Sequence, residues 1–239
     1  MSKRMIKSYI RCYYQKLYSG ENRCHLLGAK GKHLAKKLGY PDSAIDELPE
    51  YVWEYFYPCG NPFPLLRSVA TGRGLNLGCG IAVDSYVILQ VTRSVRQVIN
   101  LDIIEKVLKK SRCSLIHSTS NRFQWCCGDA DKLPFRAGSF DWVLMNGVFN
   151  LFSDKRALLL EARRVLRRGG SIVVCDLFLQ SHLPPYFQEE LDAWAWCMNG
   201  AVSRKRLIDL LNSTGFRLLE YRCEERIDWF LRSSFLAAK

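Results

Sequence analysis

Hydrophobic positions along the chain follow two different periods, and the period changes before a glycine-rich turn. In residues 1–18 apolar and aromatic side chains recur at i, i+3, i+4 and i+7, which predicts an amphipathic helix. Similar spacing predicts helices over 29–39 and 43–57. We therefore expect residues 1–70 to form a helical cap that contributes to a substrate site, ahead of a main domain over 71–239.

In the main domain, short apolar runs alternate with amphipathic segments. The apolar runs predict strands over 73–77, 97–102, 122–127, 140–146, 171–177 and 216–222. The amphipathic segments predict helices over 83–92, 104–113, 154–167, 186–198 and 203–213. A last strand over 233–238 is expected to pair antiparallel at the sheet edge. This alternation predicts an α/β fold with a doubly wound, mostly parallel sheet and helices on both faces.

The composition argues against several classes of protein. The chain is 48% hydrophobic, yet no apolar run approaches the roughly 18 residues of a membrane span. The basic start of the chain is not followed by a long apolar segment, so we do not expect a signal peptide. Ten cysteines without a repeating framework indicate free thiols in a reducing compartment. We expect a cytoplasmic protein that does not bind membranes.

The formal net charge of +12 leaves two interpretations open. A solvated basic surface would favour acidic ligands, whereas a concentrated patch would favour nucleic acid. The sequence has neither zinc-finger spacing nor an aromatic RNA-binding motif. Nucleic acid is therefore not an expected partner.

The most informative segment is the glycine turn at 75–82, between a predicted strand and a predicted helix. Gly78 and Gly80 would let a ligand approach the backbone closely, and the helix that follows offers free N–H groups. Asp102 follows about 20 residues later, at the end of the next strand, the distance expected of an acid that binds ribose hydroxyls. Asp129 follows the third strand and could accept from an adenine amino group. A helix cap for Asp102 and a turn role for Asp129 are the structural alternatives.

Five segments in this order resemble the class I S-adenosylmethionine-dependent methyltransferases. They are Leu-Asn-Leu-Gly-Cys-Gly at 75–80, Asp102, Gly-Asp-Ala-Asp-Lys-Leu-Pro-Phe at 128–135, Ser-Phe-Asp-Trp-Val at 139–143 and Arg-Val-Leu-Arg-Arg-Gly-Gly at 164–170. A dinucleotide-dependent oxidoreductase is the rival interpretation. It would need glycine where this chain has Val83, and it leaves the Asp129 segment unexplained.

The resemblance implies S-adenosyl-L-methionine as cofactor and a seven-stranded sheet with one antiparallel strand. It also implies that the methionine portion of the cofactor lies over Gly78 and Gly80. The implied cofactor contacts are Tyr14, Asn76, Gly78, Cys79, Gly80, Asp102, Ile103, Asp129, Ala130 and Asn146. Two positions depart from the family, with Asn76 in place of an acid and Ala82 in place of a glycine. A non-catalytic relative that binds the cofactor is therefore one alternative.

Segments outside the cofactor motifs resemble arsenite methyltransferases. They are Tyr-Tyr at 13–14, Phe-Tyr-Pro-Cys-Gly at 56–60, Val-Phe-Asn-Leu-Phe-Ser-Asp-Lys at 148–155 and Trp-Cys-Met-Asn-Gly-Ala at 196–201. This resemblance implies that Cys59 and Cys197 hold the substrate, and Cys24 falls near a third cysteine position of that family.

Thiols suit an arsenical acceptor. Trivalent arsenic is soft and binds thiolate sulfur, as soft metals do. Thiolates held around arsenic leave its lone pair free to attack a methyl group, so the transfer would depend on proximity and orientation without a dedicated base. Glutathione or thioredoxin would be the reductant, and arsenite or methylarsenite the small-molecule substrate.

One family cysteine is missing, because the segment Met-Asn-Gly-Val at 145–148 has Gly147 in its place. Cys59 and Cys197 could hold an already methylated arsenical, which needs two sulfurs. Cys24 could instead supply a third thiol. A further alternative is a small-molecule O-, N- or C-methyltransferase in which the cysteines have another role.

Overall fold

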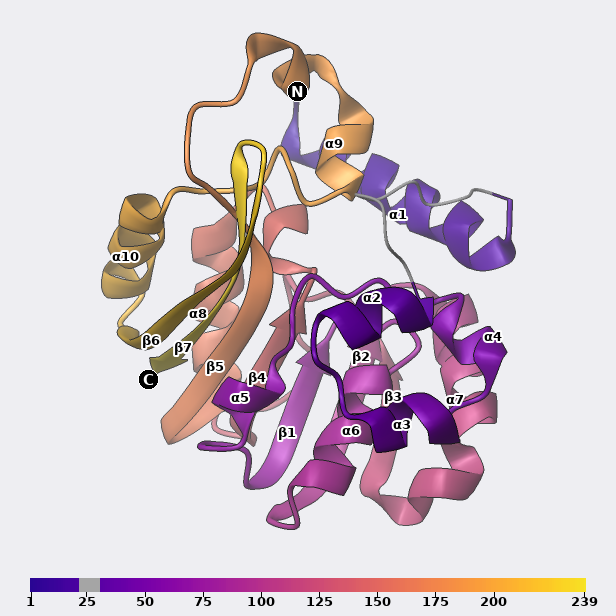
Figure 1. Cartoon of the computed structure of the whole chain (residues 1–239). Coiled ribbons are helices and arrows are strands. Elements are labelled where there is room, and N and C mark those ends of the chain that lie inside the picture. Colours follow the sequence, from indigo (N-terminus) through magenta and orange to yellow (C-terminus); the bar gives the residue numbers. More distant parts are fainter. Residues whose placement is uncertain (22–30) are drawn as a thin grey trace.

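The computed structural model describes residues 1–21 and 31–239, apart from the side chains of 116–120 and 188–189. Its centre is a seven-stranded sheet in the order β3-β2-β1-β4-β5-β7-β6 (Figure 1). The strands are β1 (Gly72–Leu77), β2 (Val95–Asp102), β3 (Phe123–Cys127), β4 (Phe140–Asn146), β5 (Leu166–Leu179), β6 (Arg217–Ile227) and β7 (Phe230–Ala238). Only β7 runs antiparallel to its neighbours. The predicted doubly wound, mostly parallel sheet is confirmed.

The prediction that residues 233–238 lie at the sheet edge is wrong. They belong to β7, which is hydrogen-bonded to β5 on one side and to β6 on the other. Most of β7 is buried, whereas β6 is largely exposed and rich in arginine and glutamate. A charged, exposed strand is the one that suits an edge.

Helices cover both faces of the sheet (Figure 1). They are α1 (Lys3–Ser19), α2 (Gly31–Lys37), α3 (Asp42–Glu47), α4 (Glu50–Trp53), α5 (Phe63–Leu66), α6 (Val83–Val91), α7 (Glu105–Thr119), α8 (Lys155–Val165), α9 (Leu191–Ala195) and α10 (Arg204–Ser213). The part of the chain that the structure describes also has short 3-10 helices at η1 (Ser120–Arg122), η2 (Phe149–Leu151) and η3 (Pro185–Glu189). None of the described helices is long and apolar enough to cross a membrane.

Two predicted helices are each broken into shorter pieces. The segment 43–57 forms α3 and α4, because Pro49 has no N–H and holds Leu48 in an extended conformation (φ −81°, ψ 135°). The segment 186–198 forms η3 and α9, and α9 ends before Cys197, which has a left-handed φ of 62°.

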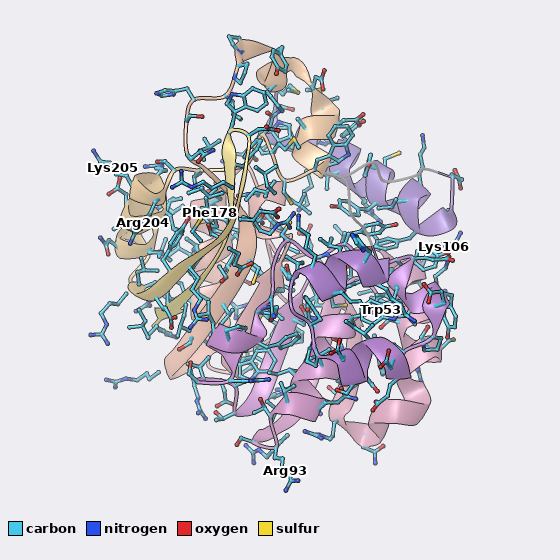
Figure 2. All side chains as sticks on the ribbon, in the orientation of Figure 1. Trp53, Arg93, Lys106, Phe178, Arg204 and Lys205 are labelled. Carbon is cyan, nitrogen blue, oxygen red and sulfur yellow. The ribbon has the colours of Figure 1, made fainter. Side chains whose placement is uncertain are left out.

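Two apolar cores separate the layers. On one face of the sheet, Trp142 and Leu144 pack with α6, α7 and the helices α3 and α4, with Trp53 at the centre (Figure 2). On the other face, Val143 and Met145 pack with α8 and α10. Alternate residues of β4 therefore feed opposite cores, as the pleat of a strand requires. The domain boundary between residues 70 and 71 stays a prediction.

Basic side chains are spread over the surface. Arg93, Lys106 and Lys205 are exposed at separate places on the molecule (Figure 2).

Candidate functional site

A cavity of about 410 Å³ lies where β1, β2 and β4 end, beneath α1. This is the edge at which open α/β sheets bind ligands, and the volume is within the range of small-molecule sites. Nine of the ten predicted cofactor residues line it: Tyr14, Gly78, Cys79, Gly80, Asp102, Ile103, Asp129, Ala130 and Asn146. The tenth, Asn76, does not.

The glycine turn forms the floor of the cavity. Gly78 has φ +64°, and a Cβ there would lie 2.4 Å from Val148 Cγ2, so only glycine fits. Ala82 caps α6 with φ 63° and no side-chain hydrogen bond. A left-handed alanine is strained by about 1 kcal/mol, whereas glycine, which the family resemblance implies here, would not be strained.

Asp102 links the turn to the next strand. Its Oδ2 accepts from the Gly80 N–H over 2.9 Å and its Oδ1 accepts from the Ile104 N–H over 2.9 Å. Burial raises the pKa of this carboxyl group, and the backbone donors oppose that shift. Asp102 thus holds the loop while lining the cavity, where each oxygen keeps a second lone pair for a hydroxyl group.

Asp129 lies under α1. Its carboxylate and that of Asp131 both form ion pairs with Lys7. Asp129 Oδ1 also accepts from the Asp131 N–H over 3.0 Å, so the predicted turn role is present as well. A second ion pair, between Lys3 and Asp154 (2.7 Å), holds α1 over the cavity.

Asn76 is buried behind the turn. Its Nδ2 donates to Ser85 Oγ over 2.9 Å, and Ser85 Oγ donates to Asn100 Oδ1 over 2.6 Å. The amide therefore joins β1, α6 and β2. It carries no charge that could face a cationic cofactor.

The sequence reasoning missed Asp84, which lies in the first turn of α6 and lines the cavity. Only 6% of it is exposed. Its Oδ1 accepts from the Tyr40 hydroxyl over 2.6 Å and its Oδ2 from Asn146 Nδ2 over 3.0 Å. Burial raises its pKa to about 6, and among the described residues no cation forms an ion pair with it. The sequence signal that could have found Asp84 is a single acid directly after the glycine turn, in an otherwise uncharged helix.

Asn146 joins this acid to the loop that carries Cys59. Its Oδ1 accepts from the Cys59 N–H over 2.8 Å and the Gly60 N–H over 3.2 Å. The other side of the loop is held by Arg232 of β7, whose Nη1 donates to the Cys59 carbonyl over 2.9 Å. The position of Cys59 is thus set by two distant strands.

Cys59, Cys197 and Asp176 of β5 lie close together. The two Sγ atoms and a carboxylate oxygen lie within 4.8 Å of one another. The Cys197 Sγ also donates to the Gly147 carbonyl over 3.5 Å. A hydrogen bond with Cys59 and burial raise the pKa of Cys197 well above its usual value. The two predicted substrate cysteines are therefore adjacent, 138 positions apart in the chain but within reach of one small ligand.

Gly147 borders the same cluster. A Cβ at this position would lie 3.2 Å from Cys59 Sγ, so a cysteine here would add its sulfur to the pair. Cys24, the other predicted thiol, lies outside the described residues.

Asp176 was also missed by the sequence reasoning. It accepts from the Asn150 N–H (3.0 Å), Asn150 Nδ2 (2.9 Å) and the Leu177 N–H (2.8 Å). Burial nevertheless raises its pKa to about 6. Lys155 is also buried, and burial lowers its pKa to about 8 although the nearby charge of Asp176 opposes this.

Comparison with known proteins connects this geometry to a family. A family model described as a methyltransferase domain matches residues 70–215, more than half of the chain. The chain belongs to this methyltransferase domain family. The matched residues contain the glycine turn, Asp102, Asp129, Asn146, Gly147 and the predicted substrate cysteine Cys197, whereas Cys59 precedes them.

Among curated proteins, this chain is 26% identical to the arsenite methyltransferase of Halobacterium salinarum over 186 residues, covering 78% of this chain and 47% of that protein. The human arsenite methyltransferase is 29% identical over 182 residues, covering 72% and 48%. The chain spans about half the length of the curated relatives it matches.

Among solved structures, this chain superposes on an arsenic(III) S-adenosylmethionine methyltransferase from Chlamydomonas reinhardtii with a TM-score of 0.67. The two are 25% identical, and the match covers 82% of this chain and 72% of that one. The resemblance inferred from the sequence is confirmed, and so is S-adenosyl-L-methionine as cofactor. The cavity fits this group, since glycines, a ribose-type acid and an unpaired carboxylate line it.

Proposed function

We propose that this protein is an S-adenosylmethionine-dependent methyltransferase whose acceptor is a trivalent arsenical, with methylarsenite preferred over arsenite. The observation that carries the proposal is the pair of adjacent thiols, Cys59 and Cys197, beside the cofactor cavity. The relatives named arsenite methyltransferases support the same acceptor class.

The link between cavity and thiols runs through two neighbouring residues. Asn146 and Gly147 both line the cavity. Asn146 accepts from the backbone N–H of Cys59, and the carbonyl of Gly147 accepts from Cys197 Sγ. An acceptor atom on the two sulfurs would therefore lie next to the wall of the cofactor cavity.

For the methyl transfer, the main task of the protein is to hold the acceptor in position. The cofactor, when bound, supplies an electrophilic methyl group. Cys59 and Cys197 lose their thiol protons to the hydroxyl groups of methylarsenite, and two water molecules leave as two As–S bonds form. Arsenic then keeps its methyl group and its lone pair, and proximity drives the transfer. Because arsenic gives up its lone pair, glutathione or thioredoxin is proposed to return two electrons to it.

The preference for methylarsenite follows from Gly147. Arsenite has three exchangeable hydroxyl groups and is held best by three thiolates, whereas methylarsenite has two. A third sulfur is missing where Gly147 stands, beside Cys59 Sγ. Two thiolates match the two exchangeable hydroxyl groups of methylarsenite.

The test is a methyl-transfer assay with labelled S-adenosylmethionine, glutathione, and either methylarsenite or arsenite. We expect dimethylated product from methylarsenite and little product from arsenite. Cys59→Ser and Cys197→Ser should each abolish the reaction. Cys113→Ser, at an exposed position on α7, is the matched control and should keep full activity.

Two results would point elsewhere. If the cofactor binds but neither arsenical is methylated, the alternative is a small-molecule O-, N- or C-methyltransferase, which the missing sulfur at Gly147 favours. If calorimetry detects no binding of S-adenosylmethionine, the departures at Asn76 and Ala82 would favour a non-catalytic relative.

A further inference from the structure

The carboxylate of Asp176 lies beside the thiols of Cys59 and Cys197 and could bind a metal ion together with them. Among the described residues, one group of cysteine, histidine or acidic side chains could hold a metal ion, namely Cys59, Asp176 and Cys197. Asp176 and Cys197 are buried and Cys59 is half-buried, so the three donors face a protected site that can still be reached. Nothing in the proposed methyl transfer requires the carboxylate.

The donor set favours a soft or borderline divalent cation. Two thiolates select ions such as Zn²⁺ and Cd²⁺ over Mg²⁺ and Ca²⁺, which prefer oxygen ligands. A tetrahedral Zn²⁺ site with Zn–S bonds of about 2.3 Å places its ligand atoms about 3.7 Å apart. The observed spread of up to 4.8 Å exceeds this separation by about 1 Å, so binding draws the three donor atoms inward.

The charge of the surroundings matches a doubly charged ion. Two thiolates and a carboxylate carry three negative charges. Lys155, which is 6% exposed and donates to the Phe152 carbonyl over 2.9 Å, offsets one of them. The remaining two negative charges equal the charge of one divalent cation, and buried charge has to be compensated.

We propose that Cys59, Cys197 and Asp176 form a three-donor site for a soft divalent cation, with two sulfur ligands and one carboxylate ligand. Binding releases the two thiol protons to solvent and leaves a fourth coordination position open. The site uses the thiols assigned to the acceptor under the proposed function, but it requires no methyl transfer. A divalent ion bound here would therefore compete with an arsenical.

The probe is Cd²⁺ alone, added to the full chain under reducing conditions without a chelating thiol. To remove an unrelated pair of adjacent thiols, the titration uses the Cys126→Ser, Cys127→Ser background. We expect one Cd²⁺ per chain, seen as a cadmium–thiolate charge-transfer band. Cys59→Ser or Cys197→Ser should weaken binding by more than about 100-fold, which exceeds the cost of losing an outer partner. Cys223→Ser, at an exposed position on β6, should change nothing.

The role of Asp176 is tested in two ways. Asp176→Asn should weaken binding by about 10- to 100-fold, since a neutral amide is the poorer ligand. Because Asp176 also accepts from Asn150, this variant is first checked for folding. The ¹¹³Cd chemical shift of the unmutated site is the second test, and a value typical of two sulfurs with oxygen supports the proposal.

Either of two results would contradict the proposed metal site. A ¹¹³Cd shift typical of three or four sulfurs would mean that another cysteine completes the site. Binding that survives in Cys59→Ser and Cys197→Ser would place the ion elsewhere. Failure of the two proposals can be told apart, because Cd²⁺ binding without arsenical methylation removes only the proposed function. Arsenical methylation without Cd²⁺ binding would contradict only the proposed metal site.

Discussion

Asn146 donates a hydrogen bond of 3.0 Å from its side-chain amide to the carboxylate of Asp84. The same amide accepts from the backbone of Cys59 through its oxygen. One side chain at the end of β4 thus joins an acid that lines the cavity to the loop that carries Cys59. Occupation of the cavity and the position of Cys59 are connected through it.

Asp84 is a buried carboxylate with two neutral donors and no cation in an ion pair with it among the described residues. S-adenosylmethionine brings positive charge on its ammonium and sulfonium groups, so we expect Asp84 to supply the acid that Asn76 lacks. Asp84→Asn should weaken S-adenosylmethionine binding by about tenfold or more, the value of a hydrogen bond to a charged group. Calorimetry with the folded variant measures this.

The control for that experiment is Asp46→Asn, an exposed acid on α3 outside the cavity, which should bind normally. A parallel titration with S-adenosylhomocysteine, which lacks the sulfonium charge, identifies the group that Asp84 faces. Equal losses for both ligands indicate the ammonium group. Unchanged affinity for both would contradict the role given to Asp84.

Cofactor affinity should depend on pH through the same residue. The pKa of Asp84 is raised to about 6, mainly by burial, and a cationic ligand binds the ionised form. Binding therefore releases a proton below this pH, and affinity should rise with pH by up to about tenfold per unit until it levels off above about 6. Asp84→Asn should flatten the profile. A profile in the variant that still rises through the same pH range would assign the titration to another group.

Local motifs in the sequence were enough to predict residues that line one cavity. Gly78, Gly80 and Asp102 belong to short segments at the ends of consecutive strands, and parallel strands bring those ends together. The acceptor side depends on contacts that no local pattern reveals. Asp176 lies near Cys59 and Cys197 because β5 pairs with β4, and because Cys197, just after α9, contacts Gly147 directly after β4.

Two errors in the fold have different causes. The position of β7 between β5 and β6 is a matter of long-range pairing, which alternation along the chain does not specify. The break at Pro49, by contrast, could have been predicted from the sequence, because a helix usually ends at or before the residue that precedes a proline. The helical spacing of apolar residues over 43–57 was weighted more heavily than this proline.

Ala82 should be a site of stabilisation. Its φ of 63° is strained for alanine and ordinary for glycine, and the residue caps α6 directly after the turn. Ala82→Gly should raise the free energy of unfolding by about 1 kcal/mol through relief of strain. Part of this gain is lost, because glycine gives the unfolded chain more conformational entropy. A change of about 1 kcal/mol corresponds to about 2–4 °C in Tm for a chain of this length, so the net rise in Tm should be smaller than this.

The matched variant is Gly20→Ala, which places alanine at φ +80° at the end of α1 with nothing within 4 Å of the new Cβ. It should lower Tm by a similar amount through backbone strain alone. Thermal unfolding without cofactor measures both changes. A fall in Tm for Ala82→Gly would mean that the Ala82 methyl group, buried in the core, outweighs the strain.

Gly147→Cys should restore a third sulfur and shift the acceptor preference toward arsenite. The new Cβ would lie 3.2 Å from Cys59 Sγ, so the thiol would face the existing pair. The φ of +71° costs about 1 kcal/mol for a residue with a side chain, and we expect a modest loss of stability. Under reducing conditions, the ratio of arsenite to methylarsenite turnover should rise. Gly147→Ala carries the same strain without sulfur and should leave that ratio unchanged. If both variants shift the ratio equally, space beside Cys59 sets the preference, and the number of thiolates does not.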